Sequence, residues 1–417
     1  MPAIGVDRMA LYPGTMALDM RTLVEARGGN VDEVCGAMMI DERSVNPPWE
    51  DPVTLAVNAG RRVLGDAERS RVKLLLVASE SAPDQEKAIS TWVQRYLELP
   101  DDCRNLEVKH ACYGGSGALR LAVSWLAAEA ESDDLALVIC TDQSRAHFGK
   151  PYEFVMGCGG VAMLLSRAPR FLEIDRRLSG LYAHEVSDLI RPTSRVEAGH
   201  SELSLLSYID AVDIAFGRYA ESVAKQRGVA LKTLDDLRRW FPRQVYHAPF
   251  GGITRRAHRV VLRTLRDWQP TCLDADFAAR IEPSLRFNRR MGGTYAGSIF
   301  ISLLGWAAAR GDSIAGERVG IYSYGSGSTG EFFSGVFGAG AGAGAAESAP
   351  HALLDARLAL TVGEYEAAEQ ARLDVVDSGD FSVSLDGFRD HYARAYSGKG
   401  MLTFRGAREH VRQYEWS

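Results

Sequence analysis

Residues 108–119 read VKHACYGGSGAL and place a cysteine, Cys112, where a short extended run gives way to small residues. A long apolar stretch with helical spacing follows at residues 119–128. A thiol on a sharp strand-to-helix turn, near the positive end of a helix, is expected to have a lowered pKa and to act as a nucleophile. The glycines would let a substrate thioester come close. The alternative is a small buried cysteine in front of a packed helix.

Continuous apolar runs on either side of Cys112 are typical of buried parallel strands. These runs are residues 73–79 (KLLLVAS), 135–141 (LALVICT) and 157–166 (GCGGVAMLLS). Helical patterns separate them, which predicts an α/β protein with helices on both faces of the sheet. The same alternation recurs after residues 166–172, so we expect two comparable α/β halves.

The composition limits the class of protein. The chain has 417 residues, 46% of them hydrophobic, which is ample for a large core. The net charge of -6 and the lack of basic runs argue against nucleic-acid binding, and the lack of any run of eighteen apolar residues argues against a membrane span. Residues 1–7 lack a basic region followed by an apolar one, so we expect no secretory signal. The six cysteines form no C-x-x-C pair and have no regular spacing, which predicts reduced thiols in a cytoplasmic protein.

Three segments late in the chain carry local predictions. Residues 337–347 (FGAGAGAGAAE) are of low complexity and are predicted to form a flexible surface loop. Residues 361–373 predict a charged helix that begins with a capping box of Thr361 and Glu364. The aromatic residues Tyr414 and Trp416 indicate that the tail docks on the protein.

Polar residues with catalytic potential lie where predicted strands end. Glu80 follows the run 73–79, Cys112 lies on its turn, and His247 lies in the short strand end predicted at residues 245–248. In open α/β sheets ligand sites gather at the carboxyl ends of strands, so these three side chains can meet. Taken singly, Glu80 could be a solvated loop acid and His247 a hydrogen-bonded buried histidine.

Other motifs are weaker. Residues 325–330 (GSGSTG) match G-x-G-x-x-G, but the low-complexity segment follows where a crossover helix should run, so we expect no nucleotide site. The histidines form no HExxH motif and no His/Cys cluster, so we expect no metal site. Arg255, Arg256 and Arg259 on the predicted helix 254–265 form either a solvated face or a docking patch for an acidic carrier.

Taken together, VASES around Glu80, KHACYGG around Cys112, YHAPFGG around His247 and SYGSG at residues 323–327 resemble the 3-hydroxy-3-methylglutaryl-CoA synthase family. The resemblance covers nearly the whole chain and implies the thiolase fold, two similar α/β halves in a layered α-β-α-β-α arrangement. We expect one half at residues 1–168 and the other at residues 169–417, the latter with a C-terminal helical extension. The stretches NPPWEDPVTLAVNAGR, YHAPFGGITRRAHR and YEWS are similar to the branch that installs β-branches in polyketide assembly lines.

The resemblance implies a role for each residue. Cys112 would take an acetyl group as a thioester, Glu80 would remove a proton from its methyl group, and His247 would hydrogen-bond the β-carbonyl that the enolate attacks. A decarboxylating ketosynthase has no need for such a glutamate. The implied partners are donor and acceptor acyl carrier proteins and a second copy of the chain. No cofactor of its own is implied, because phosphopantetheine arrives on the carrier or on coenzyme A.

The family also implies contacts to the acyl substrate from six residues: Tyr246, Pro249, Gly293, Tyr295, Gly325 and Ser326. One of these departs from the family, which carries asparagine at the position of Gly293. Another group or a water replaces that asparagine, or the acceptor differs, or condensation is weakened. Residues 145–153 are also shorter than usual and lack Arg-Tyr-Gly. The alternatives are therefore an acyltransferase that does not condense, a primary-metabolism 3-hydroxy-3-methylglutaryl-CoA synthase, and a carrier-binding scaffold.

Overall fold

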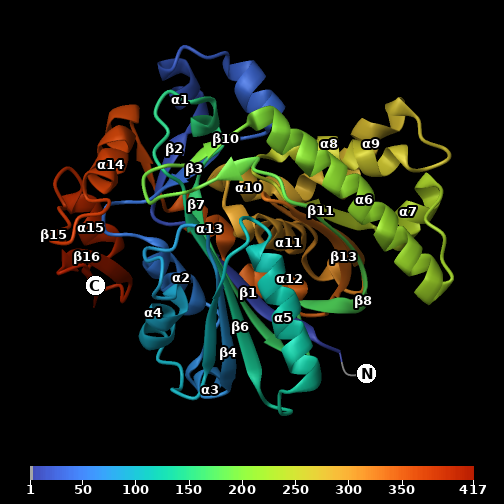
Figure 1. Cartoon of the computed structure of the whole chain (residues 1–417), viewed down its shortest axis with the longest axis horizontal. Helices are drawn as coiled ribbons and strands as arrows, with labels where there is room; N and C mark the ends of the chain where they lie inside the picture. Colours follow the sequence, from blue (N-terminus) through green and yellow to red (C-terminus); the bar gives the residue numbers. More distant parts are fainter. Residues whose placement is uncertain (1–2) are drawn as a thin grey trace.

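The computed structural model describes residues 3–417, and its centre is one mixed β-sheet (Figure 1). The order of the nine strands is β11-β12-β13-β8-β1-β7-β6-β4-β5. The bounds are β1 Gly5–Tyr12, β4 Val72–Ala78, β5 Arg104–Val108, β6 Leu135–Gln143, β7 Cys158–Ser166, β8 Leu172–Ala183, β11 Arg243–Tyr246, β12 Arg318–Gly325 and β13 Thr329–Phe337.

The strand order repeats itself within the sheet. β5, β4 and β6 run parallel, β7 and β1 follow antiparallel, and in the second half β11 and β12 run parallel while β13 and β8 follow antiparallel. The halves meet where β1 pairs with β8 at Val6 and Leu172. This repetition confirms the two similar α/β halves, although the sheet is mixed rather than parallel. The division at residues 168 and 169 stays a prediction; it falls in the connection between β7 and β8.

Helices cover both faces of each half of the sheet, and the two halves share the helices between them. The arrangement therefore has five layers, α-β-α-β-α. α5 (Gly114–Ala128) and α11 (Ser298–Arg310) share one apolar core with residues of both halves. α2 (Pro52–Gly60) and α4 (Ile89–Tyr96) cover the opposite face of the N-terminal half. α6 (Ser201–Arg227) and α8 (Gly251–Arg263) cover that of the C-terminal half. Apolar runs such as β4 are buried on both faces because each face packs on helices.

The glycines after Cys112 serve packing rather than substrate approach. α5 already begins at Gly114, and a Cβ atom on Gly115 would lie 2.6 Å from Cys140 Sγ and 2.8 Å from the Ala296 carbonyl oxygen. The small residue therefore lets α5 approach the segment before α11. The expectation that these glycines admit the substrate was wrong at Gly115.

The structure of the C-terminal half bears on two further predictions, the flexible loop at residues 337–347 and the GSGSTG motif. The expected flexible loop is wrong at residues 341–347, which form α12 (Ala341–Glu347) with Ala341, Gly342 and Ala345 buried. Small residues make this contact possible, because a Cβ on Gly342 would lie 2.3 Å from the Gly311 carbonyl carbon. The GSGSTG motif forms the turn between antiparallel β12 and β13, a geometry without a following helix to bind phosphate.

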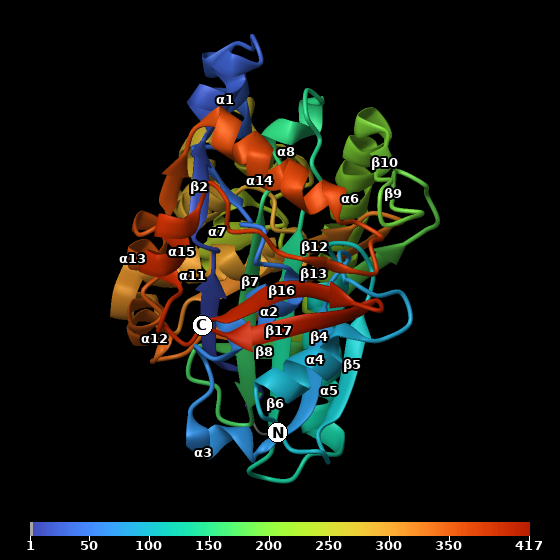
Figure 2. The ribbon, with the colours of Figure 1, turned by 90° about the vertical axis from the view of Figure 1, so that its left-hand side faces the viewer.

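The C-terminal extension packs against α2 and α4 of the N-terminal half (Figure 2). α14 (Val362–Asp374) begins with the predicted capping box, and α15 (Arg389–Ala395) follows. The extension is not only helical, because β15 (Phe381–Ser382), β16 (Leu402–Arg408) and β17 (Val411–Trp416) form a small sheet. The docking of the tail is confirmed, since the Tyr414 hydroxyl donates to Asp51 at 2.7 Å.

Within residues 3–417, no helix combines the length and the apolar composition needed to cross a membrane.

Candidate active site

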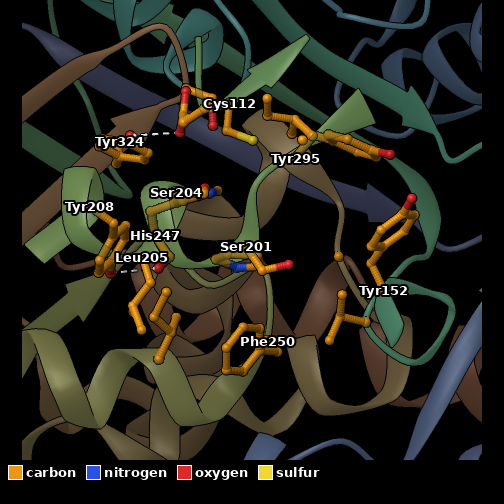
Figure 3. Close-up of a pocket in the computed structure, with 18 of the residues that line it drawn as sticks. Cys112, Tyr152, Ser201, Ser204, Leu205, Tyr208, His247, Phe250, Tyr295 and Tyr324 are labelled. Atoms are coloured by element: carbon orange, nitrogen blue, oxygen red, sulfur yellow. Dashed lines mark hydrogen bonds between the residues drawn. The ribbon is translucent and has the colours of Figure 1, made fainter. Parts of the chain in front are cut away.

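Three strand ends bring the predicted catalytic residues together. Glu80 follows β4, Cys112 follows β5 and His247 follows β11. Cys112 Sγ donates a hydrogen bond to Glu80 Oε1 at 3.4 Å. Cys112 and His247 line one cavity of about 410 Å³, and Figure 3 shows Cys112 on one side of it and Phe250 on the other, with His247 between them. A cysteine exposed to a cavity beside a carboxyl group favours the nucleophile interpretation over the packing one.

The turn that presents Cys112 is tightly held. Ala111 has a φ of 42°, a conformation that L-residues rarely adopt, and the Tyr113 amide donates to the His110 carbonyl at 3.1 Å. Gly325 from the end of β12 packs directly on this turn. A Cβ atom there would lie 2.5 Å from the Tyr113 nitrogen, so only glycine fits. Gly325 thus supports the turn, and its neighbour Ser326 lines the cavity.

The predicted lowering of the Cys112 pKa was wrong. Burial raises the pKa of Cys112 well above its usual value, and the negative charge of Glu80 raises it further. A raised pKa favours the neutral thiol over the thiolate in this site.

Glu80 belongs to a pair of carboxyl groups. Burial and the charge of Asp142 raise the pKa of Glu80 to about 8. Burial also raises the pKa of Asp142 to about 6, although Asp142 Oδ1 accepts from the Glu80 amide at 2.9 Å and the Ser81 hydroxyl at 2.8 Å. A carboxyl group with a pKa near 8 is well matched to removing a proton from a weak carbon acid near neutral pH.

Further polar and charged residues lie next to the pair of Glu80 and Asp142. The Arg191 guanidinium donates to the Glu80 carbonyl oxygen and forms an ion pair with Glu197 at 3.1 Å. Glu197 also contacts His147 Nε2 at 3.1 Å. Burial raises the pKa of Glu197, but the hydrogen bond with His147 and the charge of Arg191 outweigh burial and hold that pKa below the usual value. Glu197 therefore favours its charged form, whereas the two carboxyl groups of the Glu80–Asp142 pair have pKa values on either side of neutrality.

We expect Asp142→Asn to shift the pH dependence of condensation. The amide keeps the hydrogen-bond acceptor but removes the negative charge that raises the Glu80 pKa. The rate of a step that needs ionised Glu80 rises with pH through about 8 in the wild type. In the variant the midpoint should move down by about one pH unit. The measurement is kcat/KM from pH 5.5 to 9.5, with Asp133→Asn on the surface as control; an unmoved midpoint would contradict the coupling.

His247 is held in a neutral form. Its Nδ1 lies 2.7 Å from Ser298 Oγ, and its backbone nitrogen donates to the Tyr322 carbonyl at 2.8 Å. Burial lowers the pKa of His247 to about 3. When Ser298 donates its hydroxyl proton to Nδ1, the proton of the imidazole resides on Nε2, which then acts as a neutral hydrogen-bond donor.

The structure brings most of the expected substrate-contact residues to the cavity, but not all of them. Pro249, Gly293, Tyr295 and Ser326 line it. Gly325 does not, because it packs on the turn of Cys112, so its expected substrate contact is corrected to a packing role. Tyr246 does not either, because its hydroxyl bonds His258 Nδ1 at 3.0 Å on the buried side of β11. The expected substrate contact of Tyr246 is therefore corrected to a packing role.

The three arginines of the expected carrier patch differ in their surroundings. Arg256 is exposed and lines the cavity, so it lies at its mouth. Arg259 is exposed one turn further along α8, whereas Arg255 forms an ion pair with Asp274.

Gly293 has no room for the family's asparagine in this backbone. A Cβ atom there would lie 2.8 Å from the Val155 carbonyl oxygen and 3.1 Å from that of Pro249. The Gly293 amide donates to the same Val155 oxygen at 2.7 Å. The Val155 carbonyl, which follows the short segment of residues 145–153, thus lies where a side chain at position 293 would begin. Tyr152, Val155 and Met156 form the cavity wall there.

Several site residues were missed at the sequence level. Asp142 ends a strand just as Glu80 does, so the same strand-end argument could have found it. Arg191 and Glu197 lie in the segment between β8 and α6, which carries no periodic signal, and Ser298 is one serine at the start of an apolar helix. In the part of the chain that the structure describes, no group of three or more His, Cys, Asp or Glu residues could hold a metal ion.

Comparisons with known proteins agree with this site. Residues 263–387 match the family model of the hydroxymethylglutaryl-coenzyme A synthase C terminal. The chain is 34% identical over 349 residues to the polyketide biosynthesis 3-hydroxy-3-methylglutaryl-ACP synthase PksG of Bacillus subtilis, covering 81% of this chain and 80% of PksG. It is 29% identical to the hydroxymethylglutaryl-CoA synthase of Enterococcus faecalis, covering 89% and 92%.

Solved structures are similar over the full length. The curacin biosynthetic pathway HMG synthase in complex with holo donor-ACP has a TM-score of 0.92 at 33% identity, covering 100% of both chains. PksG of Bacillus subtilis has a TM-score of 0.91 at 31% identity, covering 99% of both. With these matches and a Cys-Glu-His site at three strand ends, the chain belongs to the hydroxymethylglutaryl-CoA synthase family.

Proposed function

We propose that the protein is a condensing enzyme that loads an acetyl group on Cys112 and adds it to a β-ketoacyl thioester held by an acyl carrier protein, as in β-branching of polyketides. The contact between Cys112 Sγ and Glu80 Oε1 at 3.4 Å carries the proposal. It places a carboxylate beside the methyl group of any acetyl thioester formed on that sulfur. A ketosynthase that decarboxylates its donor has no use for such a base.

The proposed reaction has three steps. Cys112 Sγ attacks the donor thioester, the bond to the donor sulfur breaks, and the Cys112 proton passes to the departing donor thiolate. Glu80 then removes a proton from the acetyl methyl group, and the enolate carbon bonds to the acceptor β-carbon while His247 donates a hydrogen bond to the β-carbonyl oxygen. That oxygen takes up the proton that Glu80 removed and becomes a hydroxyl group. Water finally cleaves the Cys112 thioester, which frees the thiol and leaves a carboxylate on the branch.

The proposed partners are carrier proteins, with phosphopantetheine delivered by them rather than bound as a cofactor. PksG is named as an ACP synthase, and the curacin enzyme is solved with a donor ACP. The cavity extends from exposed Arg256 to Cys112, which suits an extended arm that enters from the surface. The proposed location is the cytoplasm, supported by six free cysteines.

A two-stage assay tests the proposal. The protein is incubated with acetyl-carrier, and Cys112 is examined by mass spectrometry for an acetyl group. Acetoacetyl-carrier is then added, and a 3-hydroxy-3-methylglutaryl product is sought. Both results are expected, and the coenzyme A thioesters run in parallel should react more slowly. Faster reaction with coenzyme A would favour a primary-metabolism synthase instead.

Gly293 supports one second candidate, an acyltransferase that does not condense. The cavity lacks the side chain that related enzymes use beside the histidine. Acetylation of Cys112 without any condensed product, while the acetyl group passes to another thiol, would favour this candidate over the first.

The proposed carrier patch predicts a salt-dependent loss of binding. Arg256 and Arg259 are exposed on α8, so the double variant Arg256→Glu/Arg259→Glu should weaken carrier binding about tenfold at low salt and less at high salt. Acetyl transfer from a small thioester should survive. Calorimetry measures binding, and Arg227→Glu at the end of α6 is the control. Unchanged affinity would indicate that these arginines form a solvated face and do not bind the carrier.

We also propose a homodimer that pairs along β5. This strand ends the sheet order, and Leu106 on it and Leu121 on α5 are 50% and 55% exposed. An exposed edge strand with apolar side chains favours pairing with another chain. Light scattering should give the mass of a dimer, and Leu106→Asp should lower it toward a monomer. Val411→Asp, on exposed β17, is the control; a monomeric wild type would contradict the proposal.

A further inference from the structure

A second cavity, of about 400 Å³, lies between the N-terminal half and the C-terminal extension. Its walls come from the segments that follow β4 and β6, from the end of α14 and from the β16–β17 hairpin, which lie near one another in Figure 2. The lining residues include Ser81, Arg145 and Arg372 but neither Cys112 nor His247. The cavity is therefore distinct from the catalytic one.

Arg145 faces this cavity without a partner. Among residues 3–417 no group accepts a hydrogen bond from its guanidinium, and its Nε is buried. Burial and the nearby guanidinium groups of Arg191 and Arg372 lower the pKa of Arg145 to about 10, so it is still charged at neutral pH. A half-buried cation without a hydrogen-bonded anion is costly, because its lost hydration is not replaced.

The carboxyl groups near Arg145 are already engaged. Glu197 is shared by Arg191 and His147. The carboxyl groups that line the cavity have the following partners: Asp51 accepts from Arg412 and Tyr414, Asp84 from the backbone amides of Glu86 and Lys87, Asp377 from Ser194 and Arg195, and Glu50 from Tyr12. Burial also raises the pKa of Glu50 to about 7, which reduces its charge. Arg145 therefore has no carboxylate in direct contact, and the charges of Glu197 and Asp377, both held by other partners, act on it only from a distance.

A second guanidinium lines the same cavity. Arg372 Nη1 donates to Gln143 Oε1 at 3.0 Å and its other end contacts Glu369, while its Nε has no acceptor. The rings of Phe381 and Phe404 form apolar wall nearby. Two guanidinium groups beside an apolar surface suit an oxyanion with a small apolar body.

We propose that the second cavity binds a small oxyanion, a carboxylate or a phosphate, with Arg145 as its main ligand and Arg372 as its second. Two hydrogen bonds connect the wall of this cavity to the catalytic carboxyl pair. The backbone amide of Gln143 donates to Ser81 Oγ at 3.0 Å, and the Ser81 hydroxyl donates to Asp142 at 2.8 Å.

The test is direct binding to protein whose Cys112 has been alkylated with iodoacetamide, so that the catalytic cavity is blocked. Inorganic phosphate and glutarate are titrated separately by calorimetry in a buffer of low chloride content. We expect saturable binding of one molecule of at least one of them per chain. Arg145→Gln should weaken it at least about tenfold, since a hydrogen-bonded charge pair is lost.

Arg372→Gln is expected to weaken binding by a smaller factor, and exposed Arg310→Gln should bind like the wild type. Preference for phosphate or for glutarate identifies the class of ligand. The absence of saturable binding of both anions, or wild-type affinity in Arg145→Gln, would overturn the proposal. Because the assay uses no catalysis, a failure here leaves the proposed function untouched. If Arg145→Gln fails to fold by circular dichroism, the comparison of Arg372→Gln with Arg310→Gln decides.

Discussion

Glu80→Gln is expected to leave acetylation of Cys112 intact and to slow condensation by about a thousandfold. The amide has the shape of the carboxyl group and can still accept the hydrogen bond from Cys112 Sγ, now 3.4 Å from Glu80 Oε1. It cannot remove a proton from the acetyl methyl group. It also removes a negative charge that raises the Cys112 pKa, so formation of the thiolate becomes easier.

The two steps are measured separately, by the rate of mass increase on Cys112 and by release of the condensed product. Glu86→Gln, in the exposed segment after β4, is the matched control and should keep both rates. If Glu80→Gln loses acetylation as well, Glu80 is the base for the thiol. If it condenses normally, another group is the base for the methyl group.

His247→Ala is expected to lower the rate of condensation by about a hundredfold or more while acetylation changes little. The imidazole is neutral because burial lowers its pKa to about 3, and Ser298 at 2.7 Å from Nδ1 fixes the ring. Its Nε2 hydrogen is then available to the oxygen of the acceptor β-carbonyl, where negative charge develops. Since the pKa is so low, the contribution of His247 should not vary between pH 6 and 9.

Rates of both steps in His247→Ala, compared with His351→Ala on the surface, check this prediction. Ser298→Ala should show a weaker form of the same defect, because the ring stays but is free to turn. A loss of acetylation equal to the loss of condensation would place His247 in the first step instead.

Much of the fold could be predicted from local patterns. Apolar runs such as residues 73–79 and 135–141 became central strands because hydrophobic side chains at every position suit a sheet covered on both faces. The capping box at Thr361 and Glu364 was predictable because its hydrogen bonds lie within one turn. The meeting of Glu80 and Cys112 followed from the rule that strand ends share one edge of a sheet.

The predictions that failed depend on contacts between distant segments. Residues 337–347 looked like a flexible loop because glycine and alanine have no local preference for packing, yet Gly342 fits closely against Gly311. Gly115 was assigned to substrate approach because its partner, the segment at Ala296, lies far away in the sequence. Neither contact leaves a local signal.

The α/β class, the strand ends and the identity of the thiol, carboxyl and imidazole groups follow from the sequence, because each of these depends on neighbouring residues in the chain. The protonation of these groups depends on the folded chain. The pKa of Cys112 rises rather than falls because of burial and the charge of Glu80, and the Glu80 pKa is raised by burial and then by Asp142, 62 residues away in the sequence. Desolvation and charge–charge interaction depend on distance in space, which the order of residues does not specify.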